Sequence, residues 1–359
     1  MKFVSIICLL FISLSLSPTQ SLDCLDYQGN PTSWYFLLKY PHKTQEIHGE
    51  DNKYAYYDVS MSSSSSDFVL RNHFIDDQGE ALYSTLNQIN GNKNLQVIAW
   101  NDEPADGGAA PSENSAHSKG LIIYDSSAKK GVYIVHSMPK YPAFDSNGKV
   151  NTLIPTSERK FGQNVLCMNL DAQNLDNVAS GLGLIASIIY FNNFNDQSLP
   201  NLYAFSQKTS VQNKANSKNI QFVVDSQLPF LGFFKNPFYE QGFIFEDVMI
   251  PVLQSNLFVE SWGRPYQAPS CNQYQCLNIE SIQIQDDKLG SWNNVDDHSK
   301  WGITDSGNYV CSGDMNRMTS QAKRGGAFFC FSNAGLWGAL NAAVVKKDSC
   351  SRASNFLSN

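Results

Sequence analysis

The sequence predicts an α+β fold on the basis of two observations. Short apolar runs rich in β-branched and aromatic residues are separated by turn-rich patches, which is typical of β-strands. Helical periodicity is confined to three segments, and strands and helices do not alternate regularly as they do in a doubly wound fold. The chain has 359 residues, of which 42% are hydrophobic, enough for a sizeable core in one large domain or two lobes.

The expected elements follow in chain order from their local composition. Strands are expected at Trp34 to Tyr40, Leu95 to Trp100, Gly120 to Asp125, Gly131 to Ser137, Ile220 to Val224 and Ala327 to Phe331. Helices are expected at Gly79 to Ile89, Asn174 to Ile188 and Gly335 to Lys346. The serine run from Met61 to Asp67 predicts an exposed loop.

Residues 1–21 have the pattern of a signal peptide. Lys2 supplies a positive charge, Phe3 to Leu16 is apolar, and small residues follow up to a cleavage zone near Ser21. A membrane anchor is the weaker interpretation, because about 20 consecutive apolar residues are needed to span a bilayer. We therefore expect secretion-pathway processing and no membrane span.

Cysteine usage agrees with an oxidising compartment. Removal of Cys8 with the signal peptide leaves an odd number of cysteines, so at least one thiol stays unpaired. A zinc site is the alternative, but the chain has no C-x-x-C pair and no H-E-x-x-H motif. The sequence therefore predicts disulfide bonds and no metal or other cofactor.

The net charge of −7 and the pI near 5.4 would usually argue against a polyanionic partner. In an acidic compartment, however, the six histidines gain charge and the carboxylates begin to lose it. Composition alone therefore does not decide the partner.

The tripeptide His-Ser-Lys occurs twice, once in each half of the chain, at His117 to Lys119 and at His298 to Lys300. Each copy follows a polar turn and leads into an apolar run, so each predicts a histidine and a lysine at the start of a strand. Side chains at positions i and i+2 share one face of a strand. Two such pairs indicate a site assembled from both halves.

This set of residues is suited to splitting a phosphodiester in two steps. One imidazole can attack phosphorus to form a phosphohistidine while the other protonates the leaving oxygen, after which water releases the product. The two lysines can stabilise the charge that develops on the phosphate oxygens. The chemistry therefore requires no metal ion.

Longer stretches around the tripeptides resemble the deoxyribonuclease II family over nearly the whole mature chain. The similar stretches are CLDYQGNPTSWYFLLKYP (Cys24 to Pro41), NDEP with HSKG, VYIVHSMPKYP (Val132 to Pro142), VESWGRP, DDHSKWGI and CSGDMNRMTSQAKRGGAFFC (Cys311 to Cys330). The last of these is the most specific.

The resemblance implies a phospholipase-D-like fold, with two similar β-sheet lobes flanked by helices and the active site between them. The lobes would span 22–180 and 181–359, each with one His-x-Lys. The superfamily motif has an Asp five residues after the Lys, where this chain has Tyr124 and Asp305; the latter reads more naturally as part of a turn. The segments 136–139 (HSMP) and 313–316 (GDMN) resemble its second element.

The resemblance also implies an acid endodeoxyribonuclease that needs no metal and leaves 3′-phosphate and 5′-hydroxyl ends. The catalytic residues would be His117, Lys119, His298 and Lys300. We expect His117 as nucleophile and His298 as general acid, and the near symmetry leaves the reverse assignment open. Candidate substrate contacts are His136, Ser137, Asn316, Arg317 and Arg324, although His136 could equally be a core histidine.

The family further implies the disulfides Cys24–Cys167, Cys271–Cys350 and Cys311–Cys330, which leaves Cys276 free. The family is commonly N-glycosylated, whereas this chain has no usable sequon, so lysosomal and extracellular destinations both stay open. Two alternatives to DNA cleavage are a phosphodiesterase for another substrate and a silent secreted nucleic-acid binder. Strand preference, RNA cleavage and a monomeric or homodimeric state are undecided.

Overall fold

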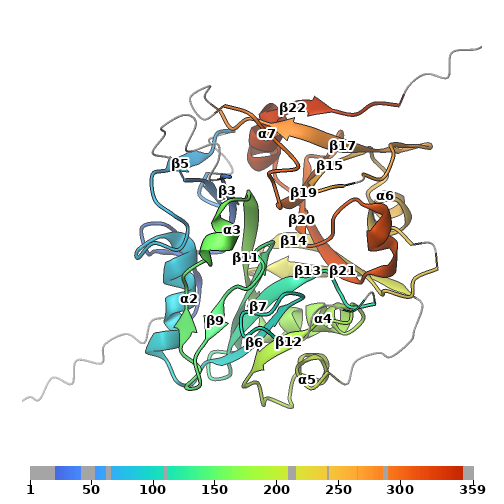
Figure 1. Cartoon of the computed structure of the whole chain (residues 1–359). Helices are drawn as coiled ribbons and strands as arrows, with labels where there is room; N and C mark the ends of the chain where they lie inside the picture. The colour runs from blue at the N-terminus through green and yellow to red at the C-terminus, as the bar shows by residue number, and fades with distance from the viewer. Residues whose placement is uncertain are drawn as a thin grey trace, which may run out of the picture.

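The computed structural model describes residues 21–41, 53–61, 66–108, 112, 114–208, 216–240, 242–264, 266–285 and 290–350. Within these ranges the chain forms two large, mainly antiparallel β-sheets with a few helices, so the predicted α+β class is confirmed (Figure 1). Strands from 34–192 build the first sheet, and strands from 217–347 build the second. The proposed signal peptide lies almost wholly outside the described residues.

The first sheet has eight strands in the order β12-β6-β7-β8-β11-β3-β4-β5. They are β3 (Trp34–Lys39), β4 (Tyr54–Asp58), β5 (Val69–Arg71), β6 (Gln96–Asn101), β7 (Lys119–Asp125), β8 (Lys130–His136), β11 (Gln163–Asp171) and β12 (Ile189–Asn192). Four of the predicted strands lie here and are confirmed. The edge strand β12 pairs with β6, so this sheet takes a strand from beyond residue 180.

The second sheet follows the order β13-β14-β21-β20-β19-β15-β17-β16, and β18 and β22 also pair with β17. Its strands are β13 (Ser217–Val224), β14 (Leu228–Lys235), β15 (Leu257–Ser261), β16 (Ser270–Cys271), β17 (Gln275–Ile282), β18 (Trp292–Asn293), β19 (Lys300–Thr304), β20 (Tyr309–Gly313), β21 (Gly326–Ser332) and β22 (Val344–Lys347). The two remaining predicted strands are confirmed as β13 and β21.

The two sheets share one hydrophobic core, which fixes how their strand ends meet. The ring of Trp34 in β3 lies 4.9 Å from that of Phe331 in β21. Likewise, Tyr133 in β8 lies 5.3 Å from Phe329 in β21. Because aromatic side chains from both sheets pack against each other, the two sheets, and with them the strand ends next to this core, are held in a fixed relative position.

Two of the three expected helices pack into the shared core, and the third packs against the other face of the first sheet. The three expected helices form as α2 (Ala81–Gly91), α4 (Ala172–Leu182) and α7 (Ala334–Ala343). The expected helix at 174–188 ends early, at the capping residue Gly183, and the chain then turns into β12. Likewise α7 gives way to β22, because the β-branched residues after it favour a strand, which pairs with β17.

Several shorter elements complete the fold. They are β1 (Cys24–Leu25), β2 (Pro31–Thr32), β9 (Ala143–Phe144), β10 (Val150–Asn151), α3 (Thr156–Arg159), α5 (Pro200–Ser206), the π-helix η1 (Phe245–Met249), α6 (Ile250–Leu253) and the 3-10 helix η3 (Thr319–Lys323). None of the helices in the described ranges is long and apolar enough to cross a membrane.

Two disulfides tie the terminal segments to the rest of the chain, and a third joins the neighbouring strands β20 and β21. They are Cys24–Cys167, Cys271–Cys350 and Cys311–Cys330, the pairs that the family resemblance implied. Among the described cysteines Cys276 is free, and it is buried. This pattern is typical of proteins that fold in an oxidising compartment.

Candidate active site

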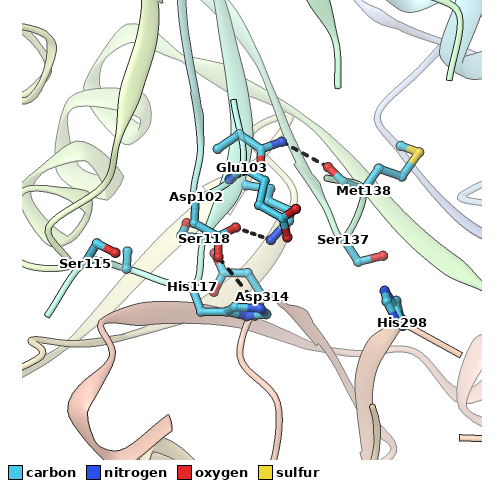
Figure 2. A network of polar contacts seen from close by, with 12 residues as sticks. Asp102, Glu103, Ser115, His117, Ser118, Ser137, Met138, His298 and Asp314 are labelled. Carbon is cyan, nitrogen blue, oxygen red and sulfur yellow. Dashed lines mark hydrogen bonds and ion pairs between the residues drawn. The ribbon is translucent and has the colours of Figure 1, made fainter. Parts of the chain in front are cut away.

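Both His-Ser-Lys tripeptides lie where the two sheets meet, and each occupies the start of a central strand. Strand β7 begins at Lys119 and strand β19 begins at Lys300, so His117 and His298 directly precede these strands as predicted. The two lysine side chains are buried. Figure 2 shows both imidazoles in the same site, one contributed by each half of the chain.

Each histidine is anchored by the backbone of the opposite sheet. The backbone N–H of His117 donates to the carbonyl of Gly325, and that of His298 donates to the carbonyl of Gly162, both at 2.8 Å. A Cβ atom at Gly162 would lie 2.4 Å from a carboxylate oxygen of Asp297, and one at Gly325 would lie 2.0 Å from the carbonyl oxygen of Ile185. Glycine is therefore required at both positions for the sheets to approach so closely.

The same hydrogen bonds recur next to each tripeptide. The backbone N–H of Ser137 donates to the carbonyl of Asn164 at 3.1 Å, and the Asn164 N–H donates back to Ser137 Oγ at 2.9 Å. In the other half, Asp314 N–H donates to the carbonyl of Ala327 at 3.2 Å, and Ala327 N–H donates back to Asp314 Oδ1 at 2.8 Å. Ser137 and Asp314 therefore occupy equivalent positions, which matches the pairing of segments 136–139 and 313–316.

His117 is held among charged groups. Its Nδ1 lies 2.6 Å from the carbonyl oxygen of Asp314. Because a carbonyl oxygen can only accept a hydrogen bond, Nδ1 carries the proton, and in the neutral imidazole Nε2 keeps its lone pair. Nε2 is 3.9 Å from the carboxylate of Asp102. That carboxylate also accepts hydrogen bonds from Lys119 and, at 3.1 Å, from Arg324 (Figure 2 shows Asp102 and Asp314 beside His117).

His298 is held among aromatic groups. The ring of Phe161 stacks on its imidazole with centroids 3.8 Å apart and planes 12° from parallel. The ring of Trp262 meets it edge-on at 5.6 Å. Lys300 folds back so that its ammonium donates to the carbonyl of His298. The two histidines therefore make the same backbone hydrogen bond to a glycine carbonyl, but their imidazole rings have different surroundings.

Both imidazoles have lowered pKa values. Burial lowers the pKa of His117 to about 3, with Lys119, Lys300 and Arg324 contributing and Asp102 opposing. Burial also lowers the pKa of His298 far below the usual imidazole range, and Lys300, Lys119 and His117 lower it further. Burial, followed by the charge of Lys119, lowers the pKa of Lys300 to about 7. The charges of Lys119 and Lys300 thus lower the pKa of both imidazoles.

The predicted contact residues in segment 136–139 have different environments. Ser137 Oγ donates to Gln163 Oε1 at 2.5 Å, and Figure 2 shows Ser137 next to His298. His136 is buried, its Nδ1 accepts from Met138 N–H at 3.2 Å, and burial lowers its pKa to about 3. This environment supports the interpretation of His136 as a core histidine beneath the site.

The structure separates the two predicted arginines. Arg324 reaches the site, where it contacts Asp102. Arg317 is fully buried, and its guanidinium donates to Glu246 at 2.6 Å and to Asn278 at 2.8 Å. We therefore assign Arg317 a structural role in place of the predicted contact with DNA, because its donors are used within the fold. Its neighbour Asn316 is buried with Oδ1 unpaired among the described groups.

Several residues of the site were not predicted. Asp102 and Trp262 lie in the stretches NDEP and VESWGRP that carry the family resemblance, but nothing in the sequence shows which imidazole each contacts. Phe161 lies outside every quoted motif. Conversely, Asp305 binds Ser255 Oγ at 2.7 Å in a turn, as its TDSGN context predicted.

The described residues contain no group of three or more His, Cys, Asp or Glu side chains arranged to hold a metal ion. The family model for deoxyribonuclease II matches residues 23–350. The chain belongs to the deoxyribonuclease II family. This membership makes it a hydrolase of the deoxyribonuclease class.

Relatives of this family member come from distant organisms. Deoxyribonuclease-2-beta of Rattus norvegicus is 28% identical, with 95% of this chain and 97% of the relative covered. Cell-death-related nuclease 7 of Caenorhabditis elegans is 26% identical, with 97% and 93% covered. A Burkholderia thailandensis protein with the provisional name deoxyribonuclease-2 is 31% identical, with 88% and 90% covered. The similarity thus extends over nearly the full length of each chain.

A buried carboxyl group lies close to the second tripeptide of this family member. Glu260 in β15 is opposite Trp301 in β19, and both of its carboxylate oxygens lack a partner among the described groups. Burial raises the pKa of Glu260 well above the usual range for glutamate; Asp297 raises it further and Lys300 opposes the shift. The folded protein therefore binds this proton more tightly than the unfolded chain does.

Glu260 is expected to make the free energy of unfolding depend on pH. A raised carboxyl pKa favours folding below the usual glutamate pKa and costs stability as the pH rises above it. Glu260→Gln removes the charge, so we expect a melting temperature several degrees higher than wild type near pH 7.5 and almost unchanged near pH 4. Glu240→Gln, at an exposed position, is the control. An equal shift at both pH values would contradict the prediction.

Proposed function

We propose that the protein is an acid endodeoxyribonuclease that cleaves DNA without a metal ion, through a phosphohistidine, to 3′-phosphate and 5′-hydroxyl ends. The main support is the imidazole of His117, whose Nδ1 is bound to the carbonyl of Asp314, while Nε2 makes no hydrogen bond with a described residue and lies 3.9 Å from the Asp102 carboxylate. A second imidazole, His298, is contributed by the opposite half. A nucleophile and an acid are thus available at one phosphodiester.

In the first step, His117 Nε2 attacks phosphorus and the bond from phosphorus to the 5′ oxygen breaks. His298, protonated beforehand, gives its proton to that oxygen, so the leaving strand carries a 5′-hydroxyl. The new phosphoimidazolium keeps its Nδ1 proton, for which the Asp314 carbonyl is the acceptor. Lys119 and Lys300 stabilise the charge on the non-bridging phosphate oxygens.

In the second step, water attacks phosphorus and the bond to His117 breaks. His298, now neutral, accepts the proton of the water, and a 3′-phosphate leaves. The enzyme returns to its starting protonation, and every proton is accounted for by the two imidazoles and water. No step requires a group other than side chains of this chain and water.

The lowered histidine pKa values support an acid optimum. The general acid must carry a proton before the first step, and burial together with the lysines disfavours the charged imidazole. The protonated fraction of His298 therefore grows as the pH falls, and a bound phosphodiester, which is negative, raises it further. The cleavage rate should therefore begin to fall with rising pH at a pH below the usual imidazole pKa.

The matching hydrogen bonds around the two tripeptides support a phospholipase-D-like arrangement of lobes. We place them at 22–180 and 181–359, with β12 added to the first sheet. The three disulfides are in keeping with a lysosomal or secreted protein and with removal of residues 1–21.

Plasmid cleavage by the purified mature protein, with EDTA present, tests this proposal. We expect cleavage that is maximal at acid pH, resistant to chelation and independent of added metal, with fragments that a 5′-kinase labels directly. Ends that require phosphatase treatment before kinase labelling would contradict the proposed chemistry. Binding without cleavage at any pH would favour a silent binder instead.

A further inference from the structure

The repeated contacts extend beyond the catalytic groups to the segments that anchor the histidines. Lys39, at the end of β3, donates from Nζ to the carbonyl of Arg159 at 2.6 Å. Lys235, at the end of β14, donates from Nζ to the carbonyl of Ala322 at 2.9 Å. Both acceptors lie three residues before the glycine that binds a catalytic histidine. Segments 159–162 and 322–325 are therefore structural equivalents.

This equivalence pairs Lys160 with Lys323, and both are exposed. Lys160 Nζ lies 4.7 Å from the ring centre of Phe161, the ring that stacks on His298. Lys323 directly precedes Arg324, whose guanidinium reaches the Asp102 carboxylate beside His117. Lys160 thus lies beside the ring that stacks on His298, and Lys323 is next in the chain to the arginine that reaches the surroundings of His117. We call Lys160 and Lys323 the rim lysines.

The two rim lysines are not used in ion pairs within the ranges that the structure describes. Lys130, Lys140 and Lys346 each form an ion pair with an acidic side chain. Neither Lys160 nor Lys323 has an ion-pair partner among the described residues. Their charges are therefore not neutralised within the described part of the molecule, although the protein as a whole has a net charge of −7.

Space for a ligand adjoins one of them. An open pocket of about 480 Å³ is lined by Lys323 and Arg324 together with the hydroxyl-bearing residues Ser112, Thr319 and Ser320. Hydroxyl and cationic groups are the usual contacts of a DNA phosphate. Because Arg324 both lines this pocket and contacts Asp102 beside His117, the pocket adjoins the candidate active site.

We propose that Lys160 and Lys323 bind the DNA phosphates on either side of the scissile one. This inference rests on the proposed function, because it takes the phosphate between the two histidines as the reacting group. Phosphates recur at regular intervals along a DNA strand. A site built from two equivalent halves therefore presents one cation to each of the two phosphates that flank the scissile phosphate. These lysines position the substrate and do not touch the reacting atoms.

The test compares Lys160→Ala, Lys323→Ala and the double variant with wild type. Lys93→Ala, at an exposed position after α2, is the matched control. Equilibrium binding of duplex DNA is measured as a function of salt with each variant in a His117→Ala background, which by the proposed mechanism does not cleave the DNA. The slope of His117→Ala alone is taken as the wild-type slope. Cleavage of thymidine 3′-(p-nitrophenyl phosphate), which has one phosphodiester and no flanking phosphates, is measured in parallel with His117 intact.

Each lysine variant is expected to reduce the slope of log affinity against log salt by about 1, and the double variant by about 2. The Lys93 control should keep the wild-type slope, and all four variants should cleave the ester at the wild-type rate. Unchanged slopes would overturn the proposal, as would ester cleavage that falls together with DNA affinity. Failure of the proposed function is distinguishable, because wild-type protein itself would then leave the ester intact.

Discussion

Replacing His117 with alanine is expected to abolish cleavage of both DNA and thymidine 3′-(p-nitrophenyl phosphate), whereas His298→Ala should lose only the cleavage of DNA. A nucleophile is needed whatever the leaving group is, but nitrophenolate leaves without receiving a proton. General acid catalysis contributes roughly 10²–10⁴-fold, so we expect His298→Ala to lose about that factor on DNA and much less on the ester. Single-turnover rates at acid pH with EDTA provide the measurement.

The two substrates together assign the roles of the imidazoles. The environments differ because Asp314 and Asp102 flank His117, whereas Phe161 and Trp262 flank His298. The opposite pattern, with the ester cleaved only by His117→Ala, would make His298 the nucleophile. His73→Ala, whose side chain is 57% exposed, is the control for loss of a histidine. Full activity of both catalytic variants on DNA would refute the two-histidine mechanism.

Replacing Arg317 with methionine is expected to destabilise the fold by about 3–5 kcal/mol, because it leaves the carboxylate of Glu246 without its partner in a largely buried position. The guanidinium also binds Asn278 and the carbonyl of Gln267, so three segments lose contacts at once. The free energy of unfolding is measured by urea denaturation. The salt dependence of DNA binding should stay at the wild-type value.

The double variant Arg317→Met with Glu246→Gln provides the matched control. It removes both charges, so we expect it to recover part of the lost stability, with a coupling of about 0.5–3 kcal/mol between the two sites. If Arg317→Met instead kept its stability and lowered the salt slope, the contact with DNA predicted from the sequence would be correct.

Part of the sheet framework, four strands of the first sheet and two of the second, could be predicted because buried strands have a distinctive local composition. β7 and β8 are apolar runs separated by a polar turn, and they are buried along nearly their whole length. By contrast, α5 was missed because seven residues are too few to show helical periodicity. The helix expected at 174–188 was too long, because apolar residues continue past Gly183 into the core beside β12.

The sequence by itself determined which residues we propose for the chemistry and on which strands they lie. Two copies of His-Ser-Lys, each in front of an apolar run, were sufficient to place two imidazoles and two ammonium groups at strand ends. The disulfide pairs came from the family resemblance, since spacing alone permits many pairings.

Only the tertiary structure decided what surrounds each histidine. His117 and the carbonyl of Asp314 that binds its ring are 197 positions apart in the sequence, and the packing of the two sheets brings them together. The same packing places Arg324 in the site and buries Arg317 seven residues earlier. Local sequence fixes strand direction and side-chain alternation, whereas contacts between sheets depend on the whole core. The difference between the two imidazoles therefore arises from tertiary packing.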